Sequence, residues 1–124
     1  MRIVVFSGTT EGRDFSRAAA ALGIAVTVSV ATDLGAEEQG QAPGITVHSG
    51  RLLPGAMAEL LQGAALCVDA THPYARVVTE NLRGAVDTLK SLEKDAHFPI
   101  YLRLERKIDG ITEADAVSYT HLTL

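Results

Sequence analysis

The chain has 124 residues, which is enough for one domain at most, or for part of a larger protein. A hydrophobic content of 47% supports a buried core, and a net charge of −4 disfavours a nucleic-acid-binding surface. No stretch approaches the roughly 20 apolar residues of a membrane span, and no charged-then-apolar leader precedes the first apolar run. We therefore expect a cytoplasmic protein that binds neither nucleic acid nor a membrane.

The N-terminal stretch predicts the opening of a βαβ unit. A short apolar run at residues 2–6 is followed by a glycine-containing turn at residues 7–13. A helical pattern then begins, with apolar positions at Phe15, Ala18, Ala19 and Leu22. We expect Gly8 to let the backbone leave the strand sharply and Gly12 to let the helix pack closely on it. The free N–H groups of such a helix start attract phosphate, but the same turn can form without a ligand.

The rest of the chain alternates between expected strands and helices. Strands are predicted over residues 24–31, 45–48, 65–68 and 100–104. Helices are predicted to start near Pro54 and Pro73, and residues 32–44 read as a polar, glycine-containing connection. The expected buried faces of the two helices consist of Met57, Leu60, Leu61 and Ala64, and of Val78, Leu82, Ala85, Val86 and Leu89.

This alternation predicts an α/β fold with a doubly wound, Rossmann-like parallel sheet in the strand order 3-2-1-4-5. Ligands bind such sheets beyond the carboxyl ends of the strands, where the strand order reverses. In this chain the reversal falls between the first and fourth strands. The turn at residues 7–13 and the segment at residues 69–74 should therefore meet there.

The second of these segments carries four side chains that suit a site. Asp69, Thr71 and His72 follow the fourth strand directly, and Tyr74 comes just after Pro73. Each side chain also has a purely structural interpretation, as a cap, a partner for the backbone or a packing residue. Among them His72 is the best candidate for a catalytic residue, whether it positions the substrate or donates a proton.

Five blocks of sequence carry a resemblance to a known family. They are Ser-Gly-Thr-Thr-Glu-Gly-Arg at 7–13, Val-Ser-Val-Ala-Thr at 28–32, Gly-Arg-Leu at 50–52, Asp-Ala-Thr-His-Pro-Tyr-Ala at 69–75 and Leu-Arg-Leu-Glu-Arg at 102–106. In this order they resemble the N-terminal half of the precorrin-6A reductases of cobalamin biosynthesis, over residues 1 to about 107. The resemblance implies two α/β domains with the active site between them. It also implies NAD(P)H-dependent reduction of a ring double bond in precorrin-6A or its cobalt form.

The resemblance and the residue chemistry together assign two sets of site residues. The set expected to bind the cofactor is Gly8, Thr9, Thr10, Glu11, Gly12, Arg13, Thr32 and Asp33. The set expected to bind the tetrapyrrole substrate is Thr71, His72, Tyr74 and Arg103, with Arg103 pairing a substrate carboxylate. No metal site is expected, because the histidines and the single cysteine are scattered.

The residues after the second strand favour NADH over NADPH. Asp33 follows Gly12 at the distance at which an acidic residue binds the free 2′-hydroxyl of NADH. No lysine or arginine occurs between Arg13 and Arg51 except Arg17, which lies within the first predicted helix, so the turn has no local cation for a 2′-phosphate. Asp33 could instead merely cap the connection, and Arg13 or Arg51 could still reach the turn in space.

The end of the chain departs from the pattern. Residues 1–107 are expected to form the Rossmann-like domain, and residues 108–116 the start of a second half that is missing here. Residues 117–124 can be back-translated into a sequencing-adaptor sequence, so we interpret them as a non-native read-through tail, with an ordinary short strand as the alternative. A truncated half of this kind is expected to be inactive alone. The main alternative function is a non-catalytic, flavodoxin-like module that binds a nucleotide or phosphate, and a further one is a fragment that binds nothing tightly.

Overall fold

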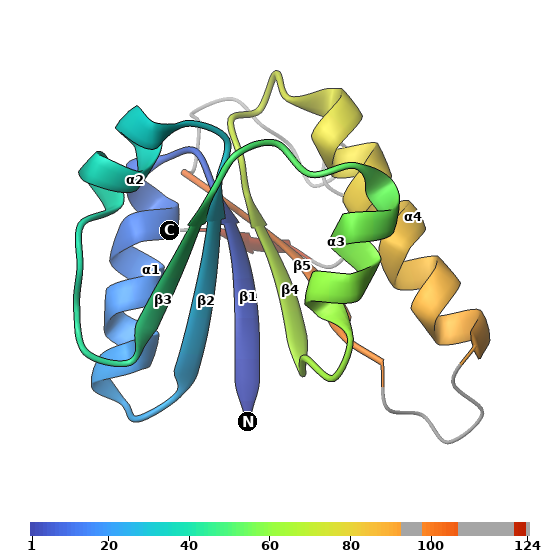
Figure 1. Cartoon of the computed structure of the whole chain (residues 1–124), viewed down its shortest axis with the longest axis horizontal. Helices are drawn as coiled ribbons and strands as arrows, with labels where there is room; N and C mark the ends of the chain where they lie inside the picture. The colour runs from blue at the N-terminus through green and yellow to red at the C-terminus, as the bar shows by residue number, and fades with distance from the viewer. Residues whose placement is uncertain (93–97, 107–120, 124) are drawn as a thin grey trace.

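The computed structural model describes residues 1–92, 98–106 and 121–123. It shows a parallel sheet with helices on both faces (Figure 1). The strands are β1 (Arg2–Ser7), β2 (Ala25–Val30), β3 (Ile45–Ser49), β4 (Leu66–Ala70), β5 (Ile100–Glu105) and β6 (His121–Thr123). The helices are α1 (Thr10–Ala21), α2 (Asp33–Gln39), α3 (Pro54–Leu61) and α4 (Arg76–Leu92). Among the described residues, no helix is long and apolar enough to cross a membrane.

The sheet has the order β3-β2-β1-β4-β5-β6, and every neighbouring pair is parallel. The first five strands confirm the predicted 3-2-1-4-5 order and the Rossmann-like fold class. The chain reverses direction across the sheet between β1 and β4, where Ser7 lies opposite Ala70. Ligands of such sheets bind at this position.

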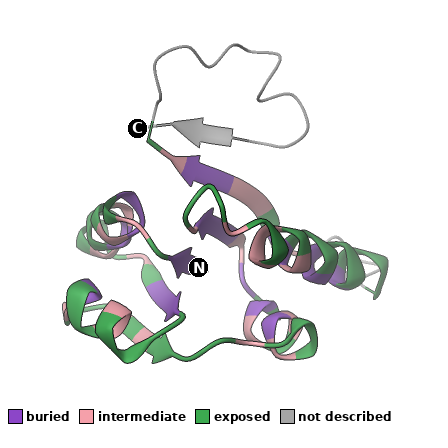
Figure 2. Ribbon diagram, turned by 90° about the horizontal axis from the view of Figure 1, so that it is seen from above, coloured by how far each residue is buried: buried purple, intermediate pink, exposed green. Residues whose placement is uncertain are grey.

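Alternate residues of the central strands are buried on opposite faces of the sheet, because successive side chains of a strand point to opposite sides. Val4 and Phe6 of β1 belong to a core shared with α3 and α4, and Ile3 and Val5 belong to a second core shared with α1. Buried residues are concentrated on the strands and on the inner faces of the helices (Figure 2). Covering on both faces explains the uninterrupted apolar run at residues 3–6 of β1.

Helix α1 buries only part of the predicted face: Ala19 is buried and Phe15 packs against the core as expected, but the other two positions do not. Its buried residues include Gly12, Ser16 and Ala19, whereas Ala18 is exposed and the expected apolar position Leu22 lies exposed at the C-cap. Small side chains on the inner face let the helix approach the sheet closely, which accounts for the shift of the buried stripe. Helix α1 ends at Ala21, and Gly23 follows it with a φ of 86°, a left-handed conformation that favours glycine after a helix.

The expected polar connection at residues 32–44 is wrong in part, because it contains helix α2. Thr32 starts this helix, with its Oγ1 accepting a hydrogen bond from the Gly35 N–H at 3.0 Å. The helix is short and has few apolar residues, so it leaves little periodicity in the sequence. Its N-cap threonine was the one local signal for it.

The second half of the described chain follows the prediction more closely. Met57, Leu61, Leu82 and Leu89 are buried against the sheet as expected, although α4 begins at Arg76 rather than near Pro73. Residues 93–97 and the expected start of a second half at 108–116 lie outside the described residues. Within the expected read-through tail, residues 117–120 and 124 also lie outside the described residues, whereas His121–Thr123 form strand β6, which pairs with β5.

Candidate functional site

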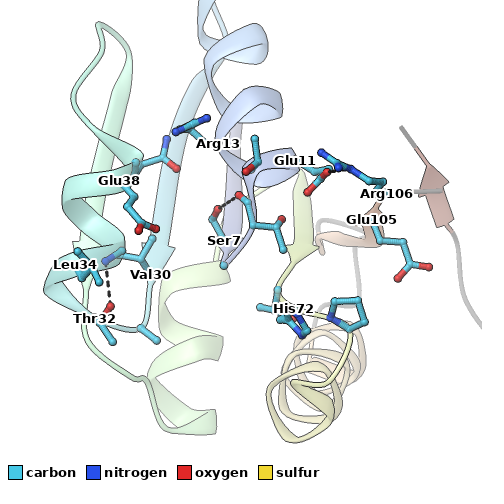
Figure 3. A pocket seen from close by; sticks show the side chains of 18 residues that line it. Ser7, Glu11, Arg13, Val30, Thr32, Leu34, Glu38, His72, Glu105 and Arg106 are labelled. Atoms are coloured by element: carbon cyan, nitrogen blue, oxygen red, sulfur yellow. Dashed lines mark hydrogen bonds and ion pairs between the residues drawn. The ribbon is translucent and has the colours of Figure 1, made fainter. Parts of the chain in front are cut away.

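A cavity of about 660 Å³ opens at the carboxyl ends of the central strands (Figure 3). Its lining comes from the carboxyl ends of four strands and the segments that follow them. These residues are 7–11 and 13 for β1, 30–32, 34–35 and 38–39 for β2, 71–73 for β4, and 105–106 for β5. This is the switch point at which the sequence places a site. The volume lies within the range of about 300–1,000 Å³ that is typical of small-molecule and cofactor sites.

The β1–α1 loop is tied to the end of β4 by two hydrogen bonds. The Gly8 N–H donates to the Ala70 carbonyl at 3.2 Å, and the Thr9 Oγ1 donates to the same carbonyl at 2.8 Å. Thr9 is also the N-cap of α1, because its Oγ1 accepts from the Gly12 N–H at 3.3 Å. Gly8 does not adopt a left-handed φ, and a Cβ on it would make only ordinary contacts with Thr71 and His72. The loop is instead held by its threonine.

Gly12 has the packing role that the sequence predicts. A Cβ at this position would collide with the Ser7 Oγ and would lie 2.9 Å from the Ala70 Cβ. Both contacts are with the sheet beneath α1. Gly12 does not line the cavity, so its missing side chain matters for the close packing of α1 on the sheet.

Asp69 organises the loop between β4 and α4 from inside the protein. Its side chain is 0% exposed, and its Oδ1 accepts from the Thr71 N–H at 3.1 Å, the Thr71 Oγ1 at 2.6 Å and the Arg103 Nη1 at 2.9 Å. Its Oδ2 accepts from the Thr79 Oγ1 at 2.7 Å and the Tyr101 hydroxyl at 2.6 Å. One carboxylate therefore links β4, β5, α4 and the loop that lines the cavity.

These contacts keep Asp69 ionised. Burial opposes the charged carboxylate, but the hydrogen bonds from Thr71, Tyr101 and Thr79, with the charge of Arg103, outweigh it and lower the pKa of Asp69. Burial and the neighbouring carboxylate raise the pKa of Tyr101, so its hydroxyl remains a donor. Burial likewise raises the pKa of the thiol of Cys67, which is buried in the core.

The structure brings most of the predicted site residues together but leaves four away from the cavity. Those on its lining are Gly8, Thr9, Thr10, Glu11, Arg13, Thr32, Thr71 and His72. Those away from it are Gly12, Asp33, Tyr74 and Arg103. Tyr74 is 86% exposed, the Asp33 Oδ1 accepts from the Ser49 Oγ at 3.1 Å, and Arg103 is buried against Asp69. The His72 Nδ1 accepts from the Tyr74 N–H at 3.3 Å, so a contact with the backbone holds this ring.

An ion pair on the β5 side of the cavity was missed by the sequence reasoning. The Arg106 Nε donates to the Glu11 Oε1 at 2.6 Å, joining the end of β5 to the first turn of α1 (Figure 3). A hydrogen bond from its own backbone N–H lowers the pKa of Glu11, and Arg106 adds to this effect. The available signal was that Arg106 directly follows β5, whose carboxyl end reaches the switch point.

No group of three or more His, Cys, Asp or Glu side chains in the described ranges is arranged to hold a metal ion. The residues present do fit a nucleotide. The cavity reaches the N-terminus of α1, where the first N–H groups have no partners within the helix. The carboxylate of Glu11 already lies at this helix start, so a phosphate would have to bind on the Thr10 side of the first turn.

The fold and the cavity define an α/β protein of the Rossmann-like class with a ligand site at its topological switch point. The family described as precorrin-6x reductase CbiJ/CobK matches residues 2–121, and the chain belongs to this family. A curated relative is the cobalt-precorrin-6A reductase of Salmonella typhimurium, with 38% identity over 88 residues. The match covers 69% of this chain and 33% of the relative, so the chain spans about a third of that protein. No solved structure matches the chain.

Proposed function

We propose that the protein to which this chain belongs reduces precorrin-6A or its cobalt form with NAD(P)H, and that this chain supplies the cofactor-binding domain. The observation that carries the proposal is the cavity at the switch point, in a chain of the precorrin-6x reductase family. A bound nicotinamide would supply the hydride for one carbon of a ring double bond, and a proton would add to the other carbon. The rest of the protein completes the substrate site.

The cofactor lies across the carboxyl ends of the strands in this proposal. Thr10 at the start of α1 would hold the pyrophosphate, and residues on the side of β2 and α2 would hold the adenosine. NADH is the preferred form. Because Asp33 does not line the cavity, the carboxylate that would oppose a 2′-phosphate is Glu38, which lines the α2 side. Arg13 lines the same side, so the preference depends on the balance between these two charges.

Thr10 offers a sharp test of the cofactor position, because it is exposed and occupies the first helical position of α1. Thr10→Glu places a carboxylate against the proposed pyrophosphate, and acidic residues at a helix start do not destabilise the helix. In the full-length protein we expect NADH affinity to fall at least about tenfold. Thr10→Gln, of the same size without the charge, should change it little. Equal affinities for the two variants would overturn the proposed cofactor position.

The catalytic proposal is tested in the same protein. Consumption of NADH that depends on added precorrin-6A or its cobalt form is the expected result. His72→Ala should lower turnover while cofactor affinity stays nearly unchanged, because His72 lies on the cavity beside β4 rather than on the α2 side. Binding of mononucleotides or flavins without a preference for dinucleotides, and without turnover, would indicate a non-catalytic nucleotide-binding module instead.

A further inference from the structure

The described residues that line the cavity include two arginines, and they lie on opposite sides of it. Arg13 lies toward α2 and Glu38, and Arg106 lies beside Glu11 at the end of β5 (Figure 3). The two cations therefore meet different parts of any ligand that spans the cavity. If the adenosine lies on the α2 side, Arg106 lies toward the reacting end.

Arg106 combines exposure with a fixed orientation. Its side chain is 74% exposed, yet its Nε is anchored on the Glu11 Oε1 at 2.6 Å. Glu11 is itself well buried, at 11% exposure, and its lowered pKa keeps it charged at neutral pH. A surface arginine usually loses much rotamer freedom when it binds a ligand. Here the ion pair has already restricted the side chain, which favours binding.

The contact with Glu11 does not use up the guanidinium. This group carries five N–H donors, and the contact with Glu11 uses the Nε edge. The terminal nitrogens are the atoms that grip a carboxylate in a forked, two-bond arrangement. Arg106 can thus hold Glu11 and a second oxyanion at the same time.

Arg103 differs from Arg106 in each of these respects. It is buried, its Nη1 contacts Asp69 and Thr71, and its Nε contacts the Glu105 carboxylate at 3.3 Å. These partners lie within the fold, and Arg103 does not line the cavity. Its role is to hold Asp69 and the β4–α4 loop, so the expected contact with a substrate carboxylate falls to another arginine.

We propose that Arg106, positioned by Glu11, is the residue that binds a carboxylate of the tetrapyrrole substrate. This inference rests on the proposed function, since it takes the substrate to be a macrocycle fringed by carboxylates. The cofactor also carries anionic groups, but its phosphates belong at the α1 start and on the α2 side. Arg106 on the β5 side is therefore assigned to the substrate.

Steady-state kinetics of the full-length protein test the assignment. Arg106→Gln should raise the KM for precorrin-6A or its cobalt form by about tenfold or more and leave the KM for NADH within about twofold. Arg106→Lys keeps the charge but cannot make the forked, two-bond contact. Its KM for the tetrapyrrole substrate should therefore lie between those of wild type and Arg106→Gln. Arg83→Gln is the matched control, because Arg83 is exposed on α4 and does not line the cavity, and it should behave as wild type. A rise in the KM for NADH alone would overturn the assignment by placing Arg106 on the cofactor.

Glu11→Gln separates binding from a merely structural ion pair. It removes the same charge pair as Arg106→Gln but leaves the cation on the cavity. A binding role predicts a much larger rise in substrate KM for Arg106→Gln than for Glu11→Gln. Equal rises in substrate KM for the two variants, or an unchanged substrate KM for Arg106→Gln in an active enzyme, would overturn the role of Arg106 but leave the proposed function standing. A wild-type protein that fails to oxidise NADH with the substrate would overturn the proposed function instead.

Discussion

Gly12 illustrates how a single residue determines the seating of an element. It lies in the first turn of α1, directly over Ser7 of β1 and Ala70 of β4. The helix whose N-terminus faces the cavity can approach the sheet only because this position lacks a side chain. The geometry of the proposed phosphate site is thus determined by a residue that does not itself line the cavity.

Gly12→Ala should therefore destabilise the fold by about 1–3 kcal/mol, because the added methyl group overpacks the contact with Ser7 and Ala70. Gly84 of α4 is the matched control, since a Cβ there meets nothing within 4 Å. Gly84→Ala should stabilise the fold by up to about 1 kcal/mol through helix propensity. Urea unfolding of both variants checks this, and Ser7→Ala should recover part of the loss at Gly12. Stabilisation by Gly12→Ala would contradict the close contact.

At the scale of elements, the Asp69 network joins parts of the chain that are distant in sequence. Asp69 of β4 accepts hydrogen bonds from Thr79 of α4 and Tyr101 of β5, and forms an ion pair with Arg103 of β5. A buried carboxylate is tolerated only when its partners replace water, and the donors here do so. The network also holds the N–H and Oγ1 of Thr71, so it shapes the loop that lines the cavity.

This network predicts a specific acid sensitivity. The folded-state pKa of Asp69 is lowered, so between that value and the unfolded value of about 3.9 the unfolded chain binds more protons. The stability that Asp69 contributes is present above the unfolded pKa and is lost as the pH falls through the folded pKa. Asp69→Asn should lower the free energy of unfolding at pH 7 by about 3–5 kcal/mol, because Arg103 then lacks its buried partner.

The measurement is chemical unfolding of wild type and variant from neutral pH down into the acidic range. Asp69→Asn should show a weaker dependence on pH over the acidic part of this range. Tyr101→Phe removes one hydrogen bond and keeps the ion pair, so its loss should be smaller, about 1.5–3 kcal/mol. Parallel pH profiles for wild type and Asp69→Asn would show that Asp69 does not titrate as described.

At the scale of the whole molecule, the cavity is open and lies on a chain that matches a third of the length of its curated relative. We predict that the chain alone gives no turnover, whereas the full-length protein oxidises NADH with precorrin-6A or its cobalt form. The physical reason is that a hydride transfer needs the substrate to be held over the cofactor, and in the proposed function the rest of the protein completes the substrate site. Steady-state assays of both proteins at equal concentration check this. Turnover by the chain alone, at the rate of the full-length protein, would contradict it.

Local patterns in the sequence determined the fold class, the order of the first five strands and the edge of the sheet at which the cavity opens. Strands and helices bury apolar residues with different periods, and parallel strands place their carboxyl ends at one edge. The same logic predicts that the stretches at residues 7–13 and 69–74 meet at the switch point, and both contribute to the cavity. It missed α2, because a short helix with few apolar residues leaves no clear periodicity.

Only the tertiary structure decided which charged groups face the cavity. Arg103 and Arg106 belong to the same short segment of the chain, yet one is buried on Asp69 and the other is exposed beside Glu11. Partners 34 and 95 residues away in the chain make that difference. The free energy of a charge depends on the burial and the counter-charge around it, and both come from segments distant in sequence. Local sequence therefore predicted an arginine at this edge, and the fold selected which one.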